Sequence, residues 1–520
     1  MTDSPAWAAL LLPAAVLVPL AFAVVCILVP TRVRRGVGLT GALVTAGLGL
    51  ALVVVVITHG PVETALAGRV PPLGIAVRAD GPAAVFLLLT SVVGALVSLF
   101  SALHPRATGD DGSRDWYWPA WLLGWSGLTA VFLAADLFNL YVALEIVGLS
   151  AVVLVALGGP GAWRAAFRYL TVTVTGSLLF LVALTLTYAA TGTLGMRLAG
   201  ERLAAGEAGV HVTIILALAA TGMAFKSALF PLHGWLPDAH AGAPGAVSPL
   251  LSALVVKSSF FALFRVWTEV TGPEAVVGTA LGIAAAGSVL WAGVAAVRTP
   301  RLKRLVGYST VSQVGYLFLF FPLSVAAGDD RGRQEAALIA VALLALAHGL
   351  AKSSLFLAAG IVKDRLGTDQ ITALADRGPA MPLVTMSLAV AGVSLAGLPV
   401  TLGFAGKWQL LLAAVDTGLW WVVAVAVAGT LLAAMYLLRP VQTLLAGPGS
   451  ATGADADDDE APTPDPATDT DAPETTGIPA VPRAAVAIPL VAALLSVGAI
   501  AASGPLADMV VLGVGAGGGT

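Results

Sequence analysis

The chain has 520 residues, of which 58% are hydrophobic and only 11% are charged, and its formal net charge is -3. A soluble domain usually carries about 25% charged residues, so this composition excludes a water-soluble protein, and the long apolar runs favour membrane helices over a β-barrel. The single cysteine, Cys26, excludes an internal disulfide and a cysteine-based metal or iron–sulfur site.

Apolar runs of membrane-spanning length predict about fourteen transmembrane helices. The first run is too long for the core of a signal peptide and no basic segment precedes it, so we interpret it as the first membrane helix. The predicted spans are 6–30, 37–58, 82–103, 116–135, 138–157, 168–190, 210–231, 245–268, 275–297, 308–327, 336–360, 382–403, 417–438 and 484–506.

The charges of the connecting loops predict the orientation. With the N-terminus outside, the loops predicted to lie inside carry sixteen Lys and Arg residues, whereas the loops predicted to lie outside carry six. Because Lys and Arg concentrate in the cytoplasmic loops of membrane proteins, this asymmetry favours fourteen spans with both termini outside.

Residues 447–482 interrupt the apolar pattern with the stretch DADDDEAPTPDPATDTDAPET. An acidic segment rich in Pro, Thr and Ala cannot bury a core, so we expect a disordered cytoplasmic linker before the last helix. This linker is either a solvated spacer or a docking segment for a basic partner.

Four ionisable residues lie inside otherwise apolar segments: Glu145, Lys226, Lys257 and Lys407. A charge at bilayer depth costs roughly 2.5–3.5 kcal/mol on insertion scales, so a chain that keeps several is expected to use them. A relay for protons or cations across the membrane is the natural use. A carboxylate such as Glu145 is expected to be neutral there unless a cation lies nearby.

Two of these lysines follow a common pattern, since each lies beside a predicted helix break. Pro231 follows Lys226 by five positions, and Gly397, Pro399 and Gly403 precede Lys407. Broken membrane helices are tolerated where they line a cavity inside the protein. The shared pattern hints at a repeated unit of five helices, 116–268 against 275–438.

The other candidates lie on unbroken runs. Serines follow Lys257, and Arg265 lies near the end of the same predicted helix, where we expect it to snorkel toward the interface. His348 and Lys352 are four residues apart and therefore share one helix face, which favours proton transfer over a role for His348 as a core residue alone. The six histidines form no HxxxH or HExxH pair, so neither a metal site nor another cofactor is expected.

These residues also carry a family resemblance. The chain resembles the proton-translocating antiporter-like proteins, which are the large subunits of Mrp-type sodium/proton antiporters and the related membrane subunits of respiratory complex I and membrane-bound hydrogenases. Length and the DLFNLY stretch make it most similar to the D subunit of an Mrp antiporter. The resemblance covers about residues 80–440, through DLFNLYVALEI (136–146), FKSALFPLHGWLPDAH (225–240), residues 243–257, RLKRLVGYSTVSQVGY (301–316), HGLAKSSLFLAAG (348–360) and GLPVTLGFAGKW (397–408).

The resemblance implies an all-α membrane fold with two inverted five-helix repeats, each containing a broken helix. It implies that Glu145 pairs with Lys226, that Lys257 and His348 continue a hydrophilic axis at mid-membrane, and that Lys407 ends it. Glu145 and Asp136 are the candidate cation-binding residues near this path. The implied regions are an N-terminal helical region (1–115), a first repeat (116–272), a second repeat (273–440), the acidic linker (441–483) and a C-terminal helix with its tail (484–520).

The expected function is that of the proton-translocating subunit of a multisubunit monovalent cation/proton antiporter, and not that of an enzyme. The expected partners are other subunits of an Mrp-type complex, the lipids of a bacterial inner membrane, protons and Na⁺, with K⁺ or Li⁺ as alternative cations and no nucleic acid. One alternative is the proton-pumping membrane subunit of an NADH-quinone oxidoreductase or membrane-bound hydrogenase. A second is a membrane scaffold that conducts nothing, which the retention of several buried charges disfavours.

Overall fold

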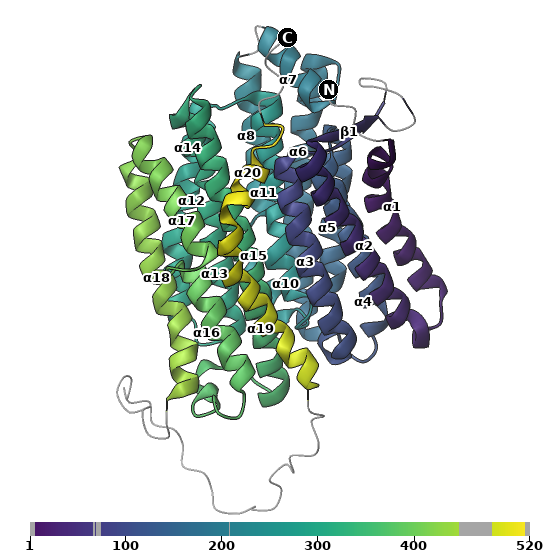
Figure 1. Cartoon of the computed structure of the whole chain (residues 1–520), viewed down its shortest axis with the longest axis vertical. Coiled ribbons are helices and arrows are strands. Elements are labelled where there is room, and N and C mark those ends of the chain that lie inside the picture. Colours follow the sequence, from purple (N-terminus) through teal and green to yellow (C-terminus); the bar gives the residue numbers. More distant parts are fainter. Residues whose placement is uncertain (1–5, 66–67, 69–73, 207–208, 447–480, 515–520) are drawn as a thin grey trace, which may run out of the picture.

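A computed structural model describes residues 6–65, 68, 74–206, 209–446 and 481–514. Long helices stand side by side and nearly parallel, so that the described part of the chain forms a slab about one helix length thick (Figure 1). A short β-hairpin lies at one end of the helices, and residues 446 and 481 lie at the other. We refer to these as the hairpin end and the linker end.

The α-helices are α1 (Ala6–Leu28), α2 (Thr31–His59), α3 (Gly81–Leu103), α4 (Tyr117–Leu133), α5 (Leu137–Ala156), α6 (Pro160–Thr191), α7 (Met196–Ala205), α8 (Gly209–Lys226), α9 (Leu236–Gly242), α10 (Ser248–Leu250), α11 (Val256–Arg265), α12 (Ala275–Arg298), α13 (Leu302–Phe318), α14 (Phe320–Ala327), α15 (Arg331–Leu366), α16 (Pro382–Ala396), α17 (Leu402–Asp416), α18 (Trp420–Leu445), α19 (Arg483–Gly498) and α20 (Ser503–Val510). The strands are β1 (Val62–Ala65) and β2 (Ala76–Ala79), which pair antiparallel with Val62 opposite Ala79. Two π-helical turns, η4 (Leu251–Val255) and η5 (Val266–Thr271), flank α11.

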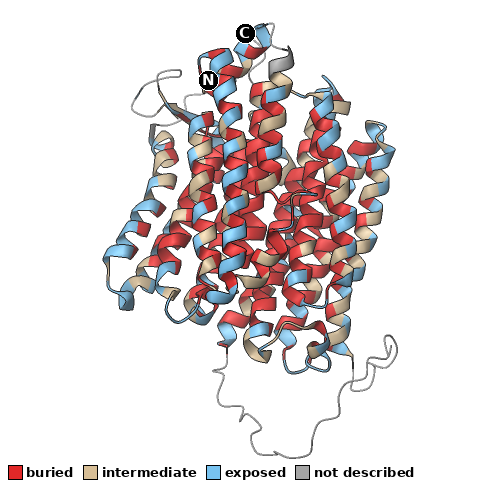
Figure 2. Ribbon diagram, turned by 180° about the vertical axis from the view of Figure 1, so that it is seen from behind, coloured by how far each residue is buried: buried red, intermediate tan, exposed pale blue. Residues whose placement is uncertain are grey.

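The exterior of the slab is apolar. Figure 2 shows buried residues concentrated in the middle of the slab and exposed residues along its outer helices and at both ends. Large apolar side chains such as Leu28, Phe167 and Trp420 are nevertheless exposed. Such a surface is unfavourable in water and favourable in lipid, so the outer face is suited to a bilayer.

Eleven helices of the described residues are long and apolar enough to cross a membrane. Three of the fourteen predicted spans fall on shorter helices: 116–135 on α4, 210–231 on α8 and 382–403 on α16. In the last two, the helix ends before the predicted span does, at Lys226 for α8 and at Ala396 for α16. The predicted disordered linker lies almost wholly in residues 447–480, outside the described part of the chain.

Both predicted helix breaks are present. α8 ends at Lys226, five residues before Pro231, because a proline ring clashes with the carbonyl four residues earlier and prevents the helix from continuing to it. α16 ends at Ala396, and Gly397 follows in the left-handed conformation with φ 77°. α17 then begins at Leu402, where the Thr401 side chain accepts a hydrogen bond from the Phe404 amide at 3.1 Å.

Glycines let the helices that carry polar residues approach closely. A Cβ atom on Gly176 of α6 would meet the Gly222 carbonyl oxygen of α8 at 2.6 Å, and a Cβ on Gly222 would meet the Gly176 carbonyl oxygen at 2.5 Å. A Cβ on Gly406 of α17 would meet the Leu344 amide nitrogen of α15 at 2.8 Å. These contacts bring α6 against Lys226 and α15 against the helix of Lys407.

Candidate functional site

The site begins with an ion pair between a residue of α5 and a residue of α8. Lys226 is the last residue of α8, and its Nζ lies 3.0 Å from Oε1 of Glu145. The lysine side chain is 5% exposed and the glutamate side chain 24%. The structure therefore brings together the two residues predicted to pair, although they are 81 positions apart in the chain.

Two hydroxyl groups of α6 complete this pair. The Lys226 ammonium also donates to Oγ1 of Thr173 at 3.2 Å, and the Ser177 hydroxyl donates to Glu145. The sequence analysis missed both residues. Their four-residue spacing within an apolar run was the available signal, since it places two hydroxyls on one helix face.

A small cavity extends from this pair toward α11. Its volume is about 10 Å³, roughly the space of one water molecule, and Lys226, Thr173, Ser258 and Ser259 contribute its polar lining. Ser258 directly follows Lys257 in the chain. The cavity thus supplies a polar position between the Glu145–Lys226 pair and the helix of the next lysine.

Lys257 lies at the junction of the π-helical turn η4 and α11. It is fully buried, and its ammonium donates to the Ser252 carbonyl within η4 at 3.1 Å. The Ser252 hydroxyl in turn lies 2.8 Å from Oγ1 of Thr310 on α13. A π-helical turn leaves backbone carbonyls outside the regular α-helical ladder, and here one of them accepts the hydrogen bond of the buried Lys257 side chain.

His348 and Lys352 both lie in the buried middle of α15, as their spacing predicted. The Lys352 ammonium donates to the Val306 carbonyl of α13 at 2.8 Å and to the Ser309 hydroxyl. Neither ring nitrogen of His348 has a hydrogen-bond partner among the described residues. Lys352 follows His348 by one helical turn on α15, so the two side chains share one face of the helix.

A second buried histidine joins this group without having been predicted as a site residue. His240 of α9 is fully buried, its ring stacks on Phe356 of α15 at 4.2 Å between centroids, and neither of its nitrogens has a described partner. The Lys352 ammonium lies 5.9 Å from the centroid of the same Phe356 ring. The signal was its place in the FKSALFPLHGWLPDAH stretch, directly after the break.

Lys407 lies on α17, one and a half turns after the second break. Its ammonium donates to the Ala396 carbonyl at 2.9 Å and to Oγ1 of Thr430 on α18 at 3.2 Å. It also lies 4.8 Å from the centroid of the Tyr316 ring, within the range of a cation–π interaction. These partners are all neutral, in contrast to the carboxylate beside Lys226.

The structure does not bring Asp136 to Glu145. Asp136 precedes α5 at the hairpin end, and its carboxylate accepts hydrogen bonds from the amides of Phe138 and Asn139 at 2.9 and 3.0 Å. Nine residues of helix separate it from Glu145, a rise of about 13 Å. Asp136 is therefore an N-cap in this structure, and its cation-binding role stays a prediction.

The prediction that Arg265 snorkels toward the interface is wrong. Arg265 is 3% exposed, and its guanidinium forms two hydrogen bonds to the Asp80 carboxylate at 2.6 and 2.7 Å. The carboxylate lies 185 positions earlier in the chain, at the N-terminus of α3. An arginine with such a partner gains more from a bidentate ion pair than from reaching the headgroups.

Comparison with known proteins shows that the chain is similar to membrane subunits of respiratory and antiporter complexes. Residues 134–433 match the family described as "NADH:quinone oxidoreductase/Mrp antiporter, TM", and this range includes each of the buried lysines above. NADH-quinone oxidoreductase subunit N of Desulforudis audaxviator is 35% identical over 78% of this chain and 80% of its own length. The D subunit of the Na⁺/H⁺ antiporter of Alkalihalophilus pseudofirmus is 29% identical over the same shares.

Solved structures give the same answer at the level of fold. A chain of the archaeal membrane-bound sulfane sulfur reductase superposes with a TM-score of 0.80 at 28% identity, covering 96% of each chain. A chain of the Mrp complex from Dietzia sp. DQ12-45-1b superposes with a TM-score of 0.80 at 24% identity, covering 98% of this chain and 97% of that one.

Proposed function

Because the chain belongs to the NADH:quinone oxidoreductase/Mrp antiporter membrane family, we propose that it is the proton-translocating subunit of a multisubunit Na⁺/proton antiporter. The observation that carries this proposal is the ion pair between the buried Lys226 and the partly exposed Glu145 beside a broken helix, with further buried lysines and histidines on neighbouring helices. The relatives named as D subunits of Na⁺/H⁺ antiporters support the choice of antiport.

The proposed mechanism is electrostatic. Two unit charges about 4 Å apart interact by about 4 kcal/mol at an effective dielectric constant near 20. Glu145 therefore stabilises the ammonium form of Lys226. When a cation approaches Glu145, or when the pair separates, this stabilisation is lost and Lys226 can release its proton.

The proton path in this proposal runs from Lys226 to Lys257, then to His348 and Lys352, and finally to Lys407. The cavity beside Lys226 supports the first step, since a single water there would bridge toward the serines next to Lys257. The shared helix face of His348 and Lys352 supports the transfer between these two residues. The close contact of α15 with α17 at Gly406 supports the last step, because Lys407 is the next residue.

The chain-level predictions complete the proposal. We place the linker end in the cytoplasm of a bacterial cell and the hairpin end outside the inner membrane, with fourteen spans, and we keep the two inverted repeats at 116–272 and 273–440. One helix break in each repeat supports this division. Glu145 and Asp136 remain the proposed cation contacts, and the proposed partners are the other subunits of an Mrp-type complex.

The alternative function is that of a membrane subunit in a quinone-linked oxidoreductase. The identity of 35% to an NADH-quinone oxidoreductase subunit N, against 29% to the antiporter subunits, favours it. Purification in mild detergent distinguishes the two functions by their co-purifying subunits. Small hydrophobic antiporter subunits support antiport, and subunits that carry flavin or iron–sulfur clusters support the alternative.

The test of the mechanism is cation-dependent acidification in vesicles that contain the assembled complex. Lys226→Met is expected to remove Na⁺-dependent ΔpH while the complex still assembles. Arg331→Gln is the matched control, because this arginine is 73% exposed at the hairpin end and pairs with Glu335 within one helix. Normal Na⁺-dependent ΔpH in an assembled Lys226→Met complex would overturn the proposal.

A further inference from the structure

A buried cluster of four charges lies at the hairpin end, above the helix of Lys257. We call Arg78, Asp80, Arg265 and Glu269 the hairpin-end cluster. Arg265 bridges both carboxylates, at 2.6 Å to Asp80 and 2.7 Å to Glu269, and Arg78 also contacts both carboxylates. The side chains of Arg78, Asp80 and Arg265 are 3–4% exposed and that of Glu269 is 13% exposed.

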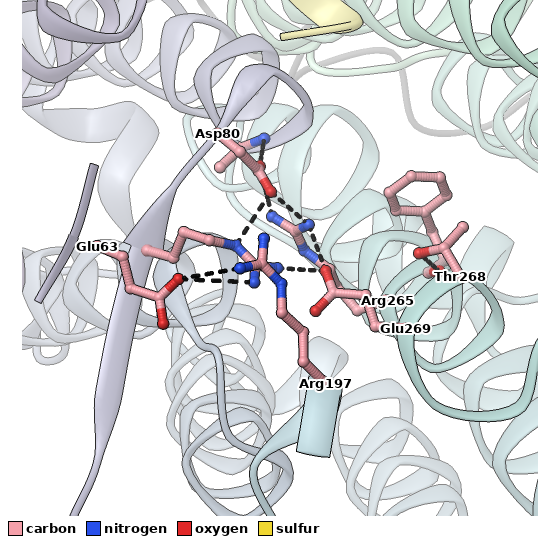
Figure 3. Close-up of polar contacts among 9 residues, drawn as sticks. Glu63, Asp80, Arg197, Arg265, Thr268 and Glu269 are labelled. Carbon is pink, nitrogen blue, oxygen red and sulfur yellow. Dashed lines mark hydrogen bonds and ion pairs between the residues drawn. The ribbon is translucent and has the colours of Figure 1, made fainter. Parts of the chain in front are cut away.

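The cluster reaches the surface on one side. Figure 3 shows Glu63 and Arg197 beside it, and Asp80, Arg265 and Glu269 joined within it. Glu63 lies 4.0 Å from Arg78 and 3.4 Å from Arg197, and both Glu63 and Arg197 are more than two-fifths exposed. The cluster therefore lies between the solvent at the hairpin end and the interior of the slab.

Beneath the cluster lies a layer of three phenylalanines, Phe86 of α3, Phe132 of α4 and Phe261 of α11. Their ring centroids are 5.1–5.3 Å apart, and each ring is at least 95% buried. The Arg265 guanidinium lies 4.8 Å from the centroid of Phe261. The three phenylalanine rings can neither donate nor accept a proton, because they have no titratable group.

One helix, α11, contributes a residue to the cluster and to the phenylalanine layer, and also carries Lys257. Lys257, Phe261 and Arg265 follow one another at intervals of four residues on α11, so they share one face of this helix. We propose that the hairpin-end cluster and the phenylalanine layer form a proton barrier that closes the way from Lys257 to the hairpin end. This inference rests on the proposed function, in which Lys257 carries protons.

The chemistry of the cluster suits a barrier better than a path. A guanidinium stays protonated under all conditions met by proteins, so neither Arg78 nor Arg265 can pass a proton on. Burial alone would raise the pKa of the Asp80 carboxyl, but Arg265 and Arg78 outweigh burial and lower this pKa to about 2.

If the cluster is a barrier, removing the charge of Arg265 must let protons leak through it. Oε2 of Glu269 is buried and has no hydrogen-bond partner among the described residues, so without Arg265 this carboxylate can accept a proton. A unit charge about 12 Å from Lys257, at an effective dielectric constant near 20, changes the barrier by an amount equivalent to about tenfold in rate. Arg265→Gln is therefore expected to raise the passive proton leak about tenfold.

The experiment measures proton entry into liposomes that contain the assembled complex, after an acid jump in Na⁺-free choline buffer. Arg265→Gln and Phe261→Ala are expected to leak, whereas Arg265→Lys and Phe261→Leu, which keep the charge and the apolar bulk, are expected to stay as tight as the unmodified complex. The double variant Arg265→Gln with Lys257→Met is expected to be tight again, because it removes the acceptor behind the barrier.

The outcomes separate the barrier from the proposed function. A tight Arg265→Gln complex would overturn the barrier, and so would a leak that persists when Lys257 is also replaced, because that leak would reflect loosened packing. The leak is measured without Na⁺. A complex that leaks as predicted yet exchanges no cation would support the barrier and contradict only the antiport function.

Discussion

The two broken helices use the same backbone device to hold lysines in different surroundings. At the first break, α8 stops at Lys226, and the ammonium faces the Glu145 carboxylate at 3.0 Å. At the second break, Lys407 faces a carbonyl oxygen at 2.9 Å, a threonine hydroxyl at 3.2 Å and the ring of Tyr316. Lys407 donates to a backbone carbonyl and a hydroxyl, whereas Lys226 donates to a carboxylate and a hydroxyl.

In the proposed mechanism, this difference gives the two lysines different tasks. The charge state of Lys226 depends on a partner whose own charge a cation can screen, so a cation can act as a switch there. The neutral partners of Lys407 solvate its ammonium form without a counter-charge to remove, which suits a site that receives and passes on protons. The comparison therefore predicts that proton exchange requires both lysines, and that losing the charged partner of Lys226 slows exchange more than losing a neutral partner of Lys407.

The largest expected effect comes from the lysines themselves. We expect Lys226→Met and Lys407→Met each to reduce Na⁺-dependent proton exchange to the level of empty vesicles, because each removes a carrier from a single path. Acidification of vesicles with the assembled complex measures the exchange, and Arg331→Gln serves as the unaffected control. Substantial exchange in only one of the two variants would show that the path does not include both breaks.

The partners of the two lysines give the next effect. Glu145→Gln removes a charge and is expected to slow exchange about 100-fold, since the lost interaction is worth several kcal/mol at this separation. Thr430→Val removes one uncharged hydrogen-bond acceptor of Lys407, worth about 1 kcal/mol, and is expected to slow exchange about fivefold. Equal losses in the two variants, measured in the same vesicle assay, would contradict the assigned difference.

The two breaks differ in how much space surrounds their glycines, and therefore in the expected effect of a Gly→Ala substitution. A Cβ on Gly403 would meet the Ser394 carbonyl oxygen at 2.0 Å, so Gly403→Ala is expected to destabilise the protein by about 1–3 kcal/mol. A Cβ on Gly234, in the first break, meets no atom within 4 Å. Gly234→Ala is expected to be neutral or to stabilise by about 0.4–1 kcal/mol. Thermal unfolding of the detergent-solubilised complex measures both, and an unchanged midpoint for Gly403→Ala would contradict the close packing.

The smallest expected effect concerns the hydroxyl groups around the first pair. Ser177→Ala and Thr173→Val each remove one hydrogen bond from the Glu145–Lys226 pair and are expected to slow exchange about fivefold. Ser150→Ala is the matched control, because this buried hydroxyl on α5 has no partner among the described residues. Loss of exchange equal to that of Glu145→Gln would mean that the hydroxyls, and not the charge, hold the pair.

The helix breaks were predictable from the sequence because their causes are local. Pro231 acts on the residue four positions before it, and Gly397 supplies a left-handed conformation at its own position. The positions of the buried charges were equally plain, since Glu145 and Lys257 stand out in apolar segments. The membrane spans around these breaks were less accurate, because hydropathy continues through residues where the helix does not.

The polar partners could not be predicted in the same way. Thr173 and Ser177 are ordinary residues for a membrane helix, and they become partners of the Glu145–Lys226 pair only because Gly176 and Gly222 let α6 and α8 approach. His240 lies near the buried lysines and histidine of α15 because its ring stacks on Phe356 of that helix.

The sequence by itself determined that this is a helical membrane protein, where two helices break, and which ionisable residues lie at bilayer depth. These properties follow from composition and from proline and glycine, whose effects extend over a few residues. The tertiary structure alone decided that Lys226 has a carboxylate and Lys407 has none, and that Arg265 is paired with Asp80. Such pairings join residues far apart in the chain, because burying a charge requires a partner that only helix packing can bring within hydrogen-bonding distance.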